Sequence, residues 1–226
     1  MTRKFVASFS AIKDYETCPF KYYNERVTRK YEQPKNEAAI WGDEVHKKIE
    51  HCINTGDALP PTMEKYQTIV DIVANSPGDI YPELKLAVTK DFTPCDFFSP
   101  DAWLRGICDL FVVNGHRAGA LDWKTGKKKK ETSQLDIMAC LGMAQFPEVE
   151  YVISSFVWLQ EPSPTRVNPK IVAREDTEEL HADFRRRIGN IEYSMAQNCW
   201  PMQQSGLCRN WCPVRECPHN GNYRRK

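Results

Sequence analysis

Residues 104–124, LRGICDLFVVNGHRAGALDWK, decide the fold. They hold two strand-like runs, at 104–113 and 117–124, in which apolar and β-branched residues predominate. Between the runs stands Asn114-Gly115, the strongest short-range signal for a β-hairpin. We therefore predict two antiparallel strands joined by a tight turn.

The length of the turn sets which side chains face each other. A two-residue loop pairs Val113 with His116, which makes Asp122 the diagonal neighbour of Asp109 on one face of the sheet. A four-residue loop keeps the parity and places the two aspartates directly opposite, whereas a three-residue loop separates them. Lys124 follows Asp122 on the same face because side chains alternate along a strand. Either even-numbered loop gathers two carboxylates and an ammonium group.

Two facing carboxylates repel unless a proton or a cation lies between them. Oxygen ligands at an open octahedral site favour Mg²⁺ or Mn²⁺, which can bind a phosphate oxygen and activate a water. A neighbouring lysine can orient that water or stabilise the transition state. Asp109, Asp122 and Lys124 therefore predict a site that hydrolyses phosphodiester bonds. The plainer alternative is two surface aspartates on a polar sheet face.

His46 is the third candidate metal ligand. The segment 38–54 repeats apolar residues at helical spacing and ends before Gly56, so it predicts an amphipathic helix. His46 shares a face with Ile49 and Ile53, the face expected to be buried. A neutral imidazole there can be a ligand of the same metal or a hydrogen-bonded core residue.

The remaining segments complete an α/β pattern. Further helices are predicted at 8–17, 62–74 and 133–145, the last capped by Thr132, and after Asp176; further strands are predicted from Glu83 to 88, at 151–159 and at 167–173. Strands alternating with helices in this order imply a sheet with helices packed around it.

The composition excludes several classes of protein. With 41% hydrophobic and 27% charged residues, the 226-residue chain can build one globular core. No apolar run reaches the roughly 18 residues of a membrane span, and no signal segment is visible, so we expect a cytoplasmic protein of a bacterial or phage-infected cell. The net charge is only +1, so nucleic-acid binding depends on local basic patches at 1–30, 124–130 and 199–226. Such patches are also compatible with solvated surface.

Seven of the nine cysteines fall into two groups. Those scattered among apolar residues are expected to be buried: Cys52, Cys95, Cys108 and Cys140. Three more are clustered in the tail: Cys208, Cys212 and Cys217. Without a secretion signal a disulfide framework is a poor explanation, and ligation of a metal or a cluster is a better one.

Four segments together resemble the PD-(D/E)XK nucleases of the RecB-like branch, which includes CRISPR-adaptation nucleases and many phage exonucleases. The segments are SAIKDYETCPFKYY at 10–23, GDEVHKKIE at 42–50, RGICDL at 105–110 and LDWKTG at 121–126. Each is a weak signal alone, but the four follow the family's order over nearly the whole chain. One departure is that the family's Q-x₃-Y becomes Gln134 and Met138 here.

The resemblance implies an α/β, restriction-endonuclease-like core with a mixed central sheet flanked by helices. It implies that His46, Asp109 and Asp122 bind Mg²⁺ or Mn²⁺, and that Lys124 is the catalytic lysine. Gln134 joins Asp109, Asp122 and Lys124 as the catalytic set, with DNA as the substrate. Further candidate contacts to DNA come from the basic segments: Lys21, Tyr22, Lys127 and Lys128.

The cysteines resemble an iron–sulfur subset of the same family, in which one N-terminal and three C-terminal cysteines hold a 4Fe–4S cluster. The matching residues are Cys18, Cys208, Cys212 and Cys217, spaced C-x₃-C-x₄-C in the tail where C-x₂-C-x₅-C is more usual. His219 leaves open a structural zinc site with the tail cysteines. Either metal would clasp the chain ends together.

The expected organisation is a single nuclease domain, 1–226. It consists of an N-terminal segment 1–36 with Cys18, a catalytic core 37–198 and a cysteine-rich tail 199–226. The predicted function is a metal-dependent DNA exonuclease that acts on single strands or DNA ends in recombination, repair or processing. Two alternatives stay open: a non-catalytic DNA-binding recombination accessory protein of the same fold, and a DNA endonuclease.

Overall fold

The computed structural model describes residues 4–32, 36–130, 132–163 and 166–223. Residues 1–3 of the predicted N-terminal basic patch and residues 224–226 of the C-terminal one therefore lie outside the described ranges. The chain forms two compact units, residues 1–6 with 35–182 and residues 7–34 with 183–226. We call them the sheet unit and the terminal unit. None of the helices in the described ranges combines the length and apolar character that a bilayer crossing needs.

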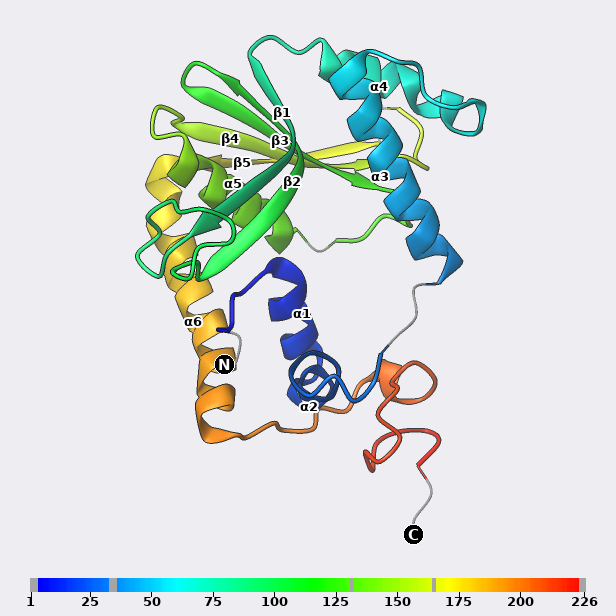
Figure 1. Cartoon of the computed structure of the whole chain (residues 1–226), viewed down its shortest axis with the longest axis vertical. Helices are drawn as coiled ribbons and strands as arrows, with labels where there is room; N and C mark the ends of the chain where they lie inside the picture. Colours follow the sequence, from blue (N-terminus) through cyan, green and yellow to red (C-terminus); the bar gives the residue numbers. More distant parts are fainter. Residues whose placement is uncertain (1–3, 33–35, 131, 164–165, 224–226) are drawn as a thin grey trace. The chain divides into compact units, whose positions relative to one another are not determined.

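A five-stranded mixed sheet forms the centre of the sheet unit (Figure 1). Its strands lie side by side in chain order: β1 (Asp79–Val88), β2 (Leu104–Asn114), β3 (Arg117–Lys124), β4 (Tyr151–Trp158) and β5 (Val167–Ala173). β3 and β4 run parallel, and the other neighbouring pairs are antiparallel. The parallel pair is joined by the crossover helix α5 (Ser133–Gln145), as parallel strands require. The predicted mixed sheet flanked by helices is confirmed.

Two helices cover one face of the sheet: α3 (Glu37–Thr55) and α4 (Gln67–Ala74) (Figure 1). Val45 and Ile49 of α3 are fully buried in a core cluster that also contains Trp123 of β3. The helix predicted at 62–74 is divided, because a 3₁₀ turn at Pro61–Tyr66 precedes α4. This face of the core fixes α3, and therefore His46, against the ends of the central strands.

The other face is covered by α5, which is buried along most of its length. At Gly142 the helix approaches β2 so closely that an added Cβ would lie 2.3 Å from Cζ of Phe111. The predicted cap, Thr132, makes no side-chain hydrogen bond to the helix end. Close packing on the sheet thus holds α5, and with it Gln134, in position.

The terminal unit is helical. It contains α1 (Phe9–Thr17), α2 (Pro19–Tyr22), a π-helical turn at Tyr23–Val27, the later part of α6 (Thr177–Gln197) and a short 3₁₀ turn at Gly206–Cys208. Ser8 caps α1, as its position in the sequence predicts, by accepting a hydrogen bond from the Ala11 nitrogen at 3.3 Å. Cys18 ends α1 and its sulfur caps α2.

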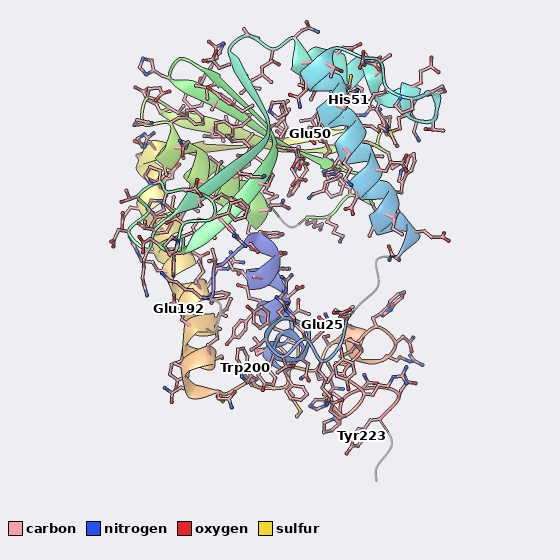
Figure 2. The ribbon with its side chains drawn as sticks, in the orientation of Figure 1. Glu25, Glu50, His51, Glu192, Trp200 and Tyr223 are labelled. Atoms are coloured by element: carbon pink, nitrogen blue, oxygen red, sulfur yellow. The ribbon has the colours of Figure 1, made fainter. Side chains whose placement is uncertain are left out.

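Aromatic and ionic contacts hold the helices of the terminal unit together. The ring of Trp200, labelled in Figure 2, stacks on Tyr23 with centroids 5.0 Å apart and lies 6.0 Å from the ring of Tyr22. The guanidinium of Arg187, which is 9% exposed, donates to both carboxylate oxygens of Glu16 at 2.6 and 2.9 Å. A bidentate pair of this kind fixes geometry as well as charge, so it ties α6 to α1.

Candidate active site

β2 and β3 pair in a register that differs from the first one predicted. Asn114 pairs with Arg117, so the two turn residues are those between them, and the predicted pairing of residues 113 and 116 is wrong. The reason is that Gly115, with a φ of 60°, takes the first turn position, which suits glycine. Although the turn has two residues, the observed register equals the one predicted for a four-residue loop. It places Asp109 level with Asp122.

The ladder between these strands ends at Leu110 and Leu121, one residue before the two aspartates. Beyond it the Trp123 backbone nitrogen donates to Asp109 Oδ2 at 2.7 Å. The Trp123 carbonyl oxygen lies 2.8 Å from His46 Nε2, and His46 Nδ1 lies 3.3 Å from the same Asp109 oxygen. Side chains of the site therefore satisfy backbone groups that the diverging strands leave unpaired.

His46 faces oxygen atoms with both ring nitrogens, which is the arrangement of a protonated imidazole. Burial lowers the pKa of His46, but the hydrogen bond and charge of Asp109, the charge of Asp122 and the Trp123 carbonyl together outweigh burial, so the net pKa is raised. An imidazole that binds a metal must be neutral at the ligating nitrogen. A cation at this position would therefore compete with protonation of His46.

Glu83 completes the cluster, although no sequence motif singled it out. Its neighbours Pro82 and Leu84 pair with the β2 residues that flank Asp109, so Glu83 stands opposite Asp109. Its φ of 49° is unusual for a non-glycine residue and marks local backbone strain. One ligand atom from each of His46, Glu83 and Asp109 lies within 4.8 Å of the others.

The acidic groups of the cluster repel one another. Burial raises the pKa of Glu83 to about 7, and the charges of Asp109 and Glu50 contribute to the rise. Glu50 lies on α3, about one turn beyond His46, and is labelled in Figure 2. A divalent cation would relieve this repulsion, and carboxylate and imidazole ligands suit Mg²⁺ or Mn²⁺. The donor set thus fits the cation that the family resemblance implies.

Asp122, Lys124 and Gln134 form a second group beside the cluster. Asp122 Oδ2 lies 2.5 Å from Lys124 Nζ, so the two side chains form a close ion pair. The Gln134 amide donates to Asp122 Oδ1 at 2.5 Å and accepts from Lys124 at 3.1 Å. Burial and the charge of Asp109 raise the pKa of Asp122 to about 6, although Lys124 opposes the rise. The lysine is held between a carboxylate and an amide.

The other predicted residues of the sheet unit lie at two different depths. Met138, at the position of the family's tyrosine, is buried in the core between α5 and the sheet. Lys127 and Lys128 belong to the exposed stretch 126–130 that follows the lysine of the site. The stretch 126–130, which we call the lysine loop, is thus accessible to a large substrate, whereas Met138 is not.

Two predicted DNA contacts in the terminal unit have other surroundings. Tyr22 is only 3% exposed and packs near Trp200, so little of its ring is open to a contact with DNA. Lys21 Nζ lies 2.6 Å from Glu25 Oε2, and the lysine side chain is 17% exposed. Lys21 is therefore a partly buried, paired cation and not a free surface charge.

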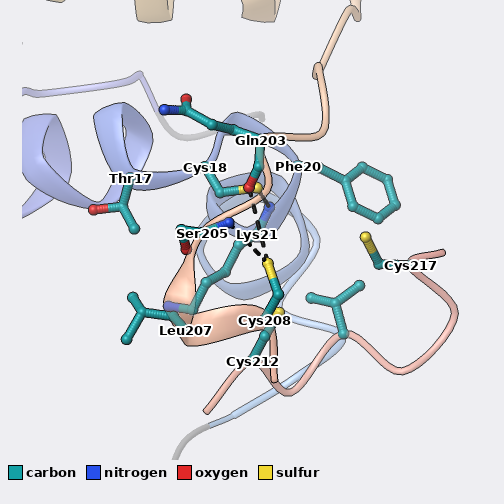
Figure 3. Close-up of a pocket in the computed structure, with 11 residues that line it drawn as sticks. Thr17, Cys18, Phe20, Lys21, Gln203, Ser205, Leu207, Cys208, Cys212 and Cys217 are labelled. Atoms are coloured by element: carbon teal, nitrogen blue, oxygen red, sulfur yellow. Dashed lines mark hydrogen bonds between the residues drawn. The ribbon is translucent and has the colours of Figure 1, made fainter. Parts of the chain in front are cut away.

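The four cysteines of the predicted clasp line one pocket of the terminal unit (Figure 3): Cys18, Cys208, Cys212 and Cys217. Backbone N–H groups contact two of the sulfurs. The Lys21 nitrogen donates to Cys18 Sγ at 3.5 Å, and the Ser205 nitrogen donates to Cys208 Sγ at 3.4 Å. His219, the alternative ligand, is exposed and is not among the described residues that line this pocket.

Asn220 organises the loop that carries the tail cysteines. It is 5% exposed, and its amide donates to the carbonyl oxygens of Cys212 at 2.9 Å and Val214 at 3.1 Å. The Gly221 nitrogen donates to the Cys208 carbonyl oxygen at 2.9 Å. These bonds fold the loop back on itself and keep its cysteines in one place.

The mixed sheet thus carries carboxylates and a lysine where two of its central strands separate. The family model of the PD-(D/E)XK nuclease superfamily matches residues 6–80 and 74–217. The chain belongs to this superfamily.

Two solved structures are similar to the chain. The crystal structure of SSO0001 has 13% sequence identity and a TM-score of 0.47, and the match covers 97% of this chain and 89% of that one. A candidate exonuclease from Eubacterium rectale has 13% identity and a TM-score of 0.42, with 83% and 82% covered. No curated protein matches the chain. The family assignment therefore depends on the sequence match to the family model.

Proposed function

We propose that this protein is a Mg²⁺- or Mn²⁺-dependent exonuclease that hydrolyses DNA, on single strands or at free ends, in recombination, repair or DNA processing. The observation that carries the proposal is the position of the His46, Glu83 and Asp109 cluster beside the group of Asp122, Lys124 and Gln134. In this proposal His46, Glu83, Asp109 and Asp122 hold the cation. The bound cation supplies a Lewis acid for a phosphate oxygen and an acidic water.

Lys124 is the catalytic residue of the proposal. Its side chain is 29% exposed, whereas that of Asp122 is 5% exposed, so the ammonium group can reach a substrate phosphate. A fixed positive charge at that point stabilises the negative charge that develops in the transition state. Gln134 positions Lys124 and Asp122 because it contacts both. A protein that only binds DNA has no need for such an arrangement, which favours the enzyme over the accessory protein.

The lysine loop supplies contacts to DNA in this proposal. Residues 127–130 are four consecutive exposed lysines, and they follow the catalytic lysine after two residues. Lysines that neutralise phosphates release counterions, so DNA binding through this loop weakens steeply with salt. Lys127 and Lys128 are the contacts that we assign, because they lie nearest in sequence to Lys124.

The cysteine pocket holds a structural 4Fe–4S cluster in our proposal. Four thiols on one pocket match the ligand count of a cluster. Within the described residues, no three of the four cysteine sulfurs lie within 4.8 Å of one another. A single tetrahedral zinc, with bonds of about 2.3 Å, holds its ligand sulfurs closer together than that. The open space is only about 10 Å³, so a cluster requires the cysteine side chains to turn outward. Zinc is the alternative occupant.

The test uses protein purified without oxygen and three DNA substrates: end-labelled single strands, end-labelled duplex and closed circular DNA. With Mg²⁺ or Mn²⁺ the linear substrates should shorten from their ends while the circle stays intact, and a chelator should stop the reaction. Cleavage of the circle would instead indicate an endonuclease. Binding of every substrate without cleavage, under all metal conditions, would support the accessory protein.

A variant pair makes the test specific to the site. Lys124→Ala should bind DNA and lose cleavage, because the ammonium group acts on the transition state. Lys47→Ala, which removes an exposed lysine of α3, should cleave at the wild-type rate.

A further inference from the structure

Lys21 stands at the edge of the cysteine pocket. It lies one helical turn after Cys18, donates its backbone N–H to the Cys18 sulfur at 3.5 Å, and lines the pocket with its side chain (Figure 3). Among the described residues that line the pocket, Lys21 is the one with a basic side chain. Most of the other lining side chains are apolar or thiols, such as Phe20, Leu207 and Val214.

The pocket needs a positive charge when its cysteines hold a metal. Four thiolates carry more negative charge than a zinc ion or an oxidised 4Fe–4S core carries positive charge, so the occupied site is anionic. Burial of a net charge is unfavourable unless an opposite charge or hydrogen-bond donors compensate for it. Reduction of a cluster adds a further negative charge, so nearby cations favour the reduced form.

Glu25 limits the positive charge that Lys21 presents to the pocket. Its Oε2 atom lies 2.6 Å from Lys21 Nζ, and the two side chains are 13% and 17% exposed, so water screens the pair only weakly. The two residues are four positions apart, which is also the spacing of an ordinary stabilising pair on a helix. That plainer role predicts that loss of either partner has the same kind of effect.

We propose that Lys21 and Glu25 together set the electrostatic potential of the cysteine pocket, with Lys21 as the charge that stabilises the thiolate-bound group. This inference rests on the proposed clasp, and it assigns to Lys21 a role different from DNA contact. It predicts that the two partners of one ion pair have opposite effects on the stability of the thiolate-bound group. Removal of the lysine charge destabilises the anionic group, and removal of the glutamate charge stabilises it.

The test compares four variants of the full chain in their metal-loaded form: Lys21→Met, Lys21→Arg, Glu25→Gln and Arg26→Met. Arg26 is the matched control, since it lies next to Glu25 on the π-helical turn, pairs with Asp14 of α1 and does not line the pocket. The first readout is the rate at which a chelator removes the metal, which applies to iron and to zinc. The second, for an iron-loaded protein, is the midpoint potential from a spectroelectrochemical titration.

Lys21→Met should lose metal faster and have a more negative midpoint potential, by on the order of tenfold in the reduction equilibrium, or about 59 mV for one electron. Glu25→Gln should lose metal more slowly and have a more positive potential. Lys21→Arg and Arg26→Met should stay close to the wild type.

Two outcomes would overturn the inference, and they can be told apart. If the metal-loaded Lys21→Met and Glu25→Gln proteins match the wild type, or shift in the same direction, the pair is only structural and the clasp proposal is untouched. If the wild-type protein binds neither iron nor zinc at these cysteines, the clasp proposal fails, and the role of Lys21 fails with it. Neither outcome bears on nuclease activity, which is measured separately.

Discussion

Asp109 accepts a hydrogen bond from the backbone nitrogen of Trp123 at 2.7 Å, at the point where β2 and β3 separate. The carboxylate thus takes the place of a strand carbonyl that the ladder no longer provides. The same oxygen lies 3.3 Å from His46 Nδ1. One side chain therefore links the sheet, α3 and the candidate metal site. A substitution at Asp109 that keeps an acceptor for the Trp123 nitrogen should affect the site more than the fold.

His46→Ala should lower metal affinity by at least about 10-fold, because the imidazole is one of the ligands that we assign and loss of a group that merely orients a ligand already costs about that much. Cleavage should fall accordingly and return in part at high Mn²⁺ concentration. His51→Ala is the matched control, since His51 lies on the same helix and pairs with Asp57 on the exposed surface. A variant of His46 that melts at a lower temperature but keeps the wild-type metal requirement would make His46 a core residue only.

Metal binding should strengthen as the pH rises. The pKa values of Glu83 and Asp122 are raised to about 7 and about 6, so the folded, metal-free protein keeps these protons where the unfolded chain has lost them. Their contribution to stability is therefore present below about pH 4 and is lost as the pH rises to about 7. A divalent cation replaces the protons and offsets the loss.

The measurement is the increase in melting temperature on addition of Mn²⁺, at pH 5 and at pH 8. We expect a larger increase at pH 8, and a smaller difference between the two values in Glu83→Gln. An increase of the same size at both pH values would mean that these carboxyl groups do not bind the cation.

Gly142→Ala should destabilise the protein by about 1–3 kcal/mol, because an added methyl group would overlap the ring of Phe111. The expected Cβ position lies 2.3 Å from Phe111 Cζ. Gly189→Ala is the control within another helix: nothing lies within 4 Å of its Cβ position, so alanine should stabilise α6 by about 0.5–1 kcal/mol. Urea unfolding of both variants checks the pair, and a neutral Gly142→Ala would contradict the packing of α5 on β2.

Substitution of the pocket cysteines should unfold the terminal unit. A metal that joins Cys18 to the tail closes almost the whole chain into a loop, and loss of such a link removes several kcal/mol from a stability that is only about 5–15 kcal/mol. Alanine at Cys18, Cys208, Cys212 or Cys217 should therefore give colourless, poorly soluble protein. Alanine at Cys52 or Cys140, which are buried outside the pocket, should leave the metal in place.

The decisive variants for the clasp are Cys18→Ala and His219→Ala, each assayed for metal content. We expect the first to lose the metal and the second to keep it. The reverse result would place a zinc ion among the tail cysteines and His219 and would exclude a link to the N-terminal helix.

The sequence located part of the site because those residues lie in short local motifs. His46 is fixed by a helical repeat, and Lys124 by the strand that carries Asp122, so each could be singled out without long-range information. Glu83 could not. Its place opposite Asp109 depends on how β1 and β2 align across the long connection 89–103, which has no turn signal that fixes a register.

The terminal unit was harder to predict for a similar reason. A lysine in a basic N-terminal segment looks like a solvated surface residue, and only the packing of α2 beside the tail makes Lys21 part of the cysteine pocket. The burial of Tyr22 against Trp200, which lies far away in the sequence, likewise leaves no local pattern. The first predicted hairpin register was wrong by two residues, because Gly115 can occupy either position of a tight turn.

The central claim is that a divalent cation held at Asp109 is required for DNA cleavage, and Asp109→Asn tests it most directly. Asparagine keeps an oxygen for the Trp123 N–H, so the fold should survive while the charge is lost. Mn²⁺ binding by calorimetry and cleavage of end-labelled DNA are measured on the same preparation, with the exposed Asp57→Asn as control. We predict loss of Mn²⁺ binding and a fall in cleavage of at least about 100-fold, with a melting temperature close to that of the wild type. Cleavage by Asp109→Asn at the wild-type rate, or cleavage by the wild type in excess chelator, would contradict the account.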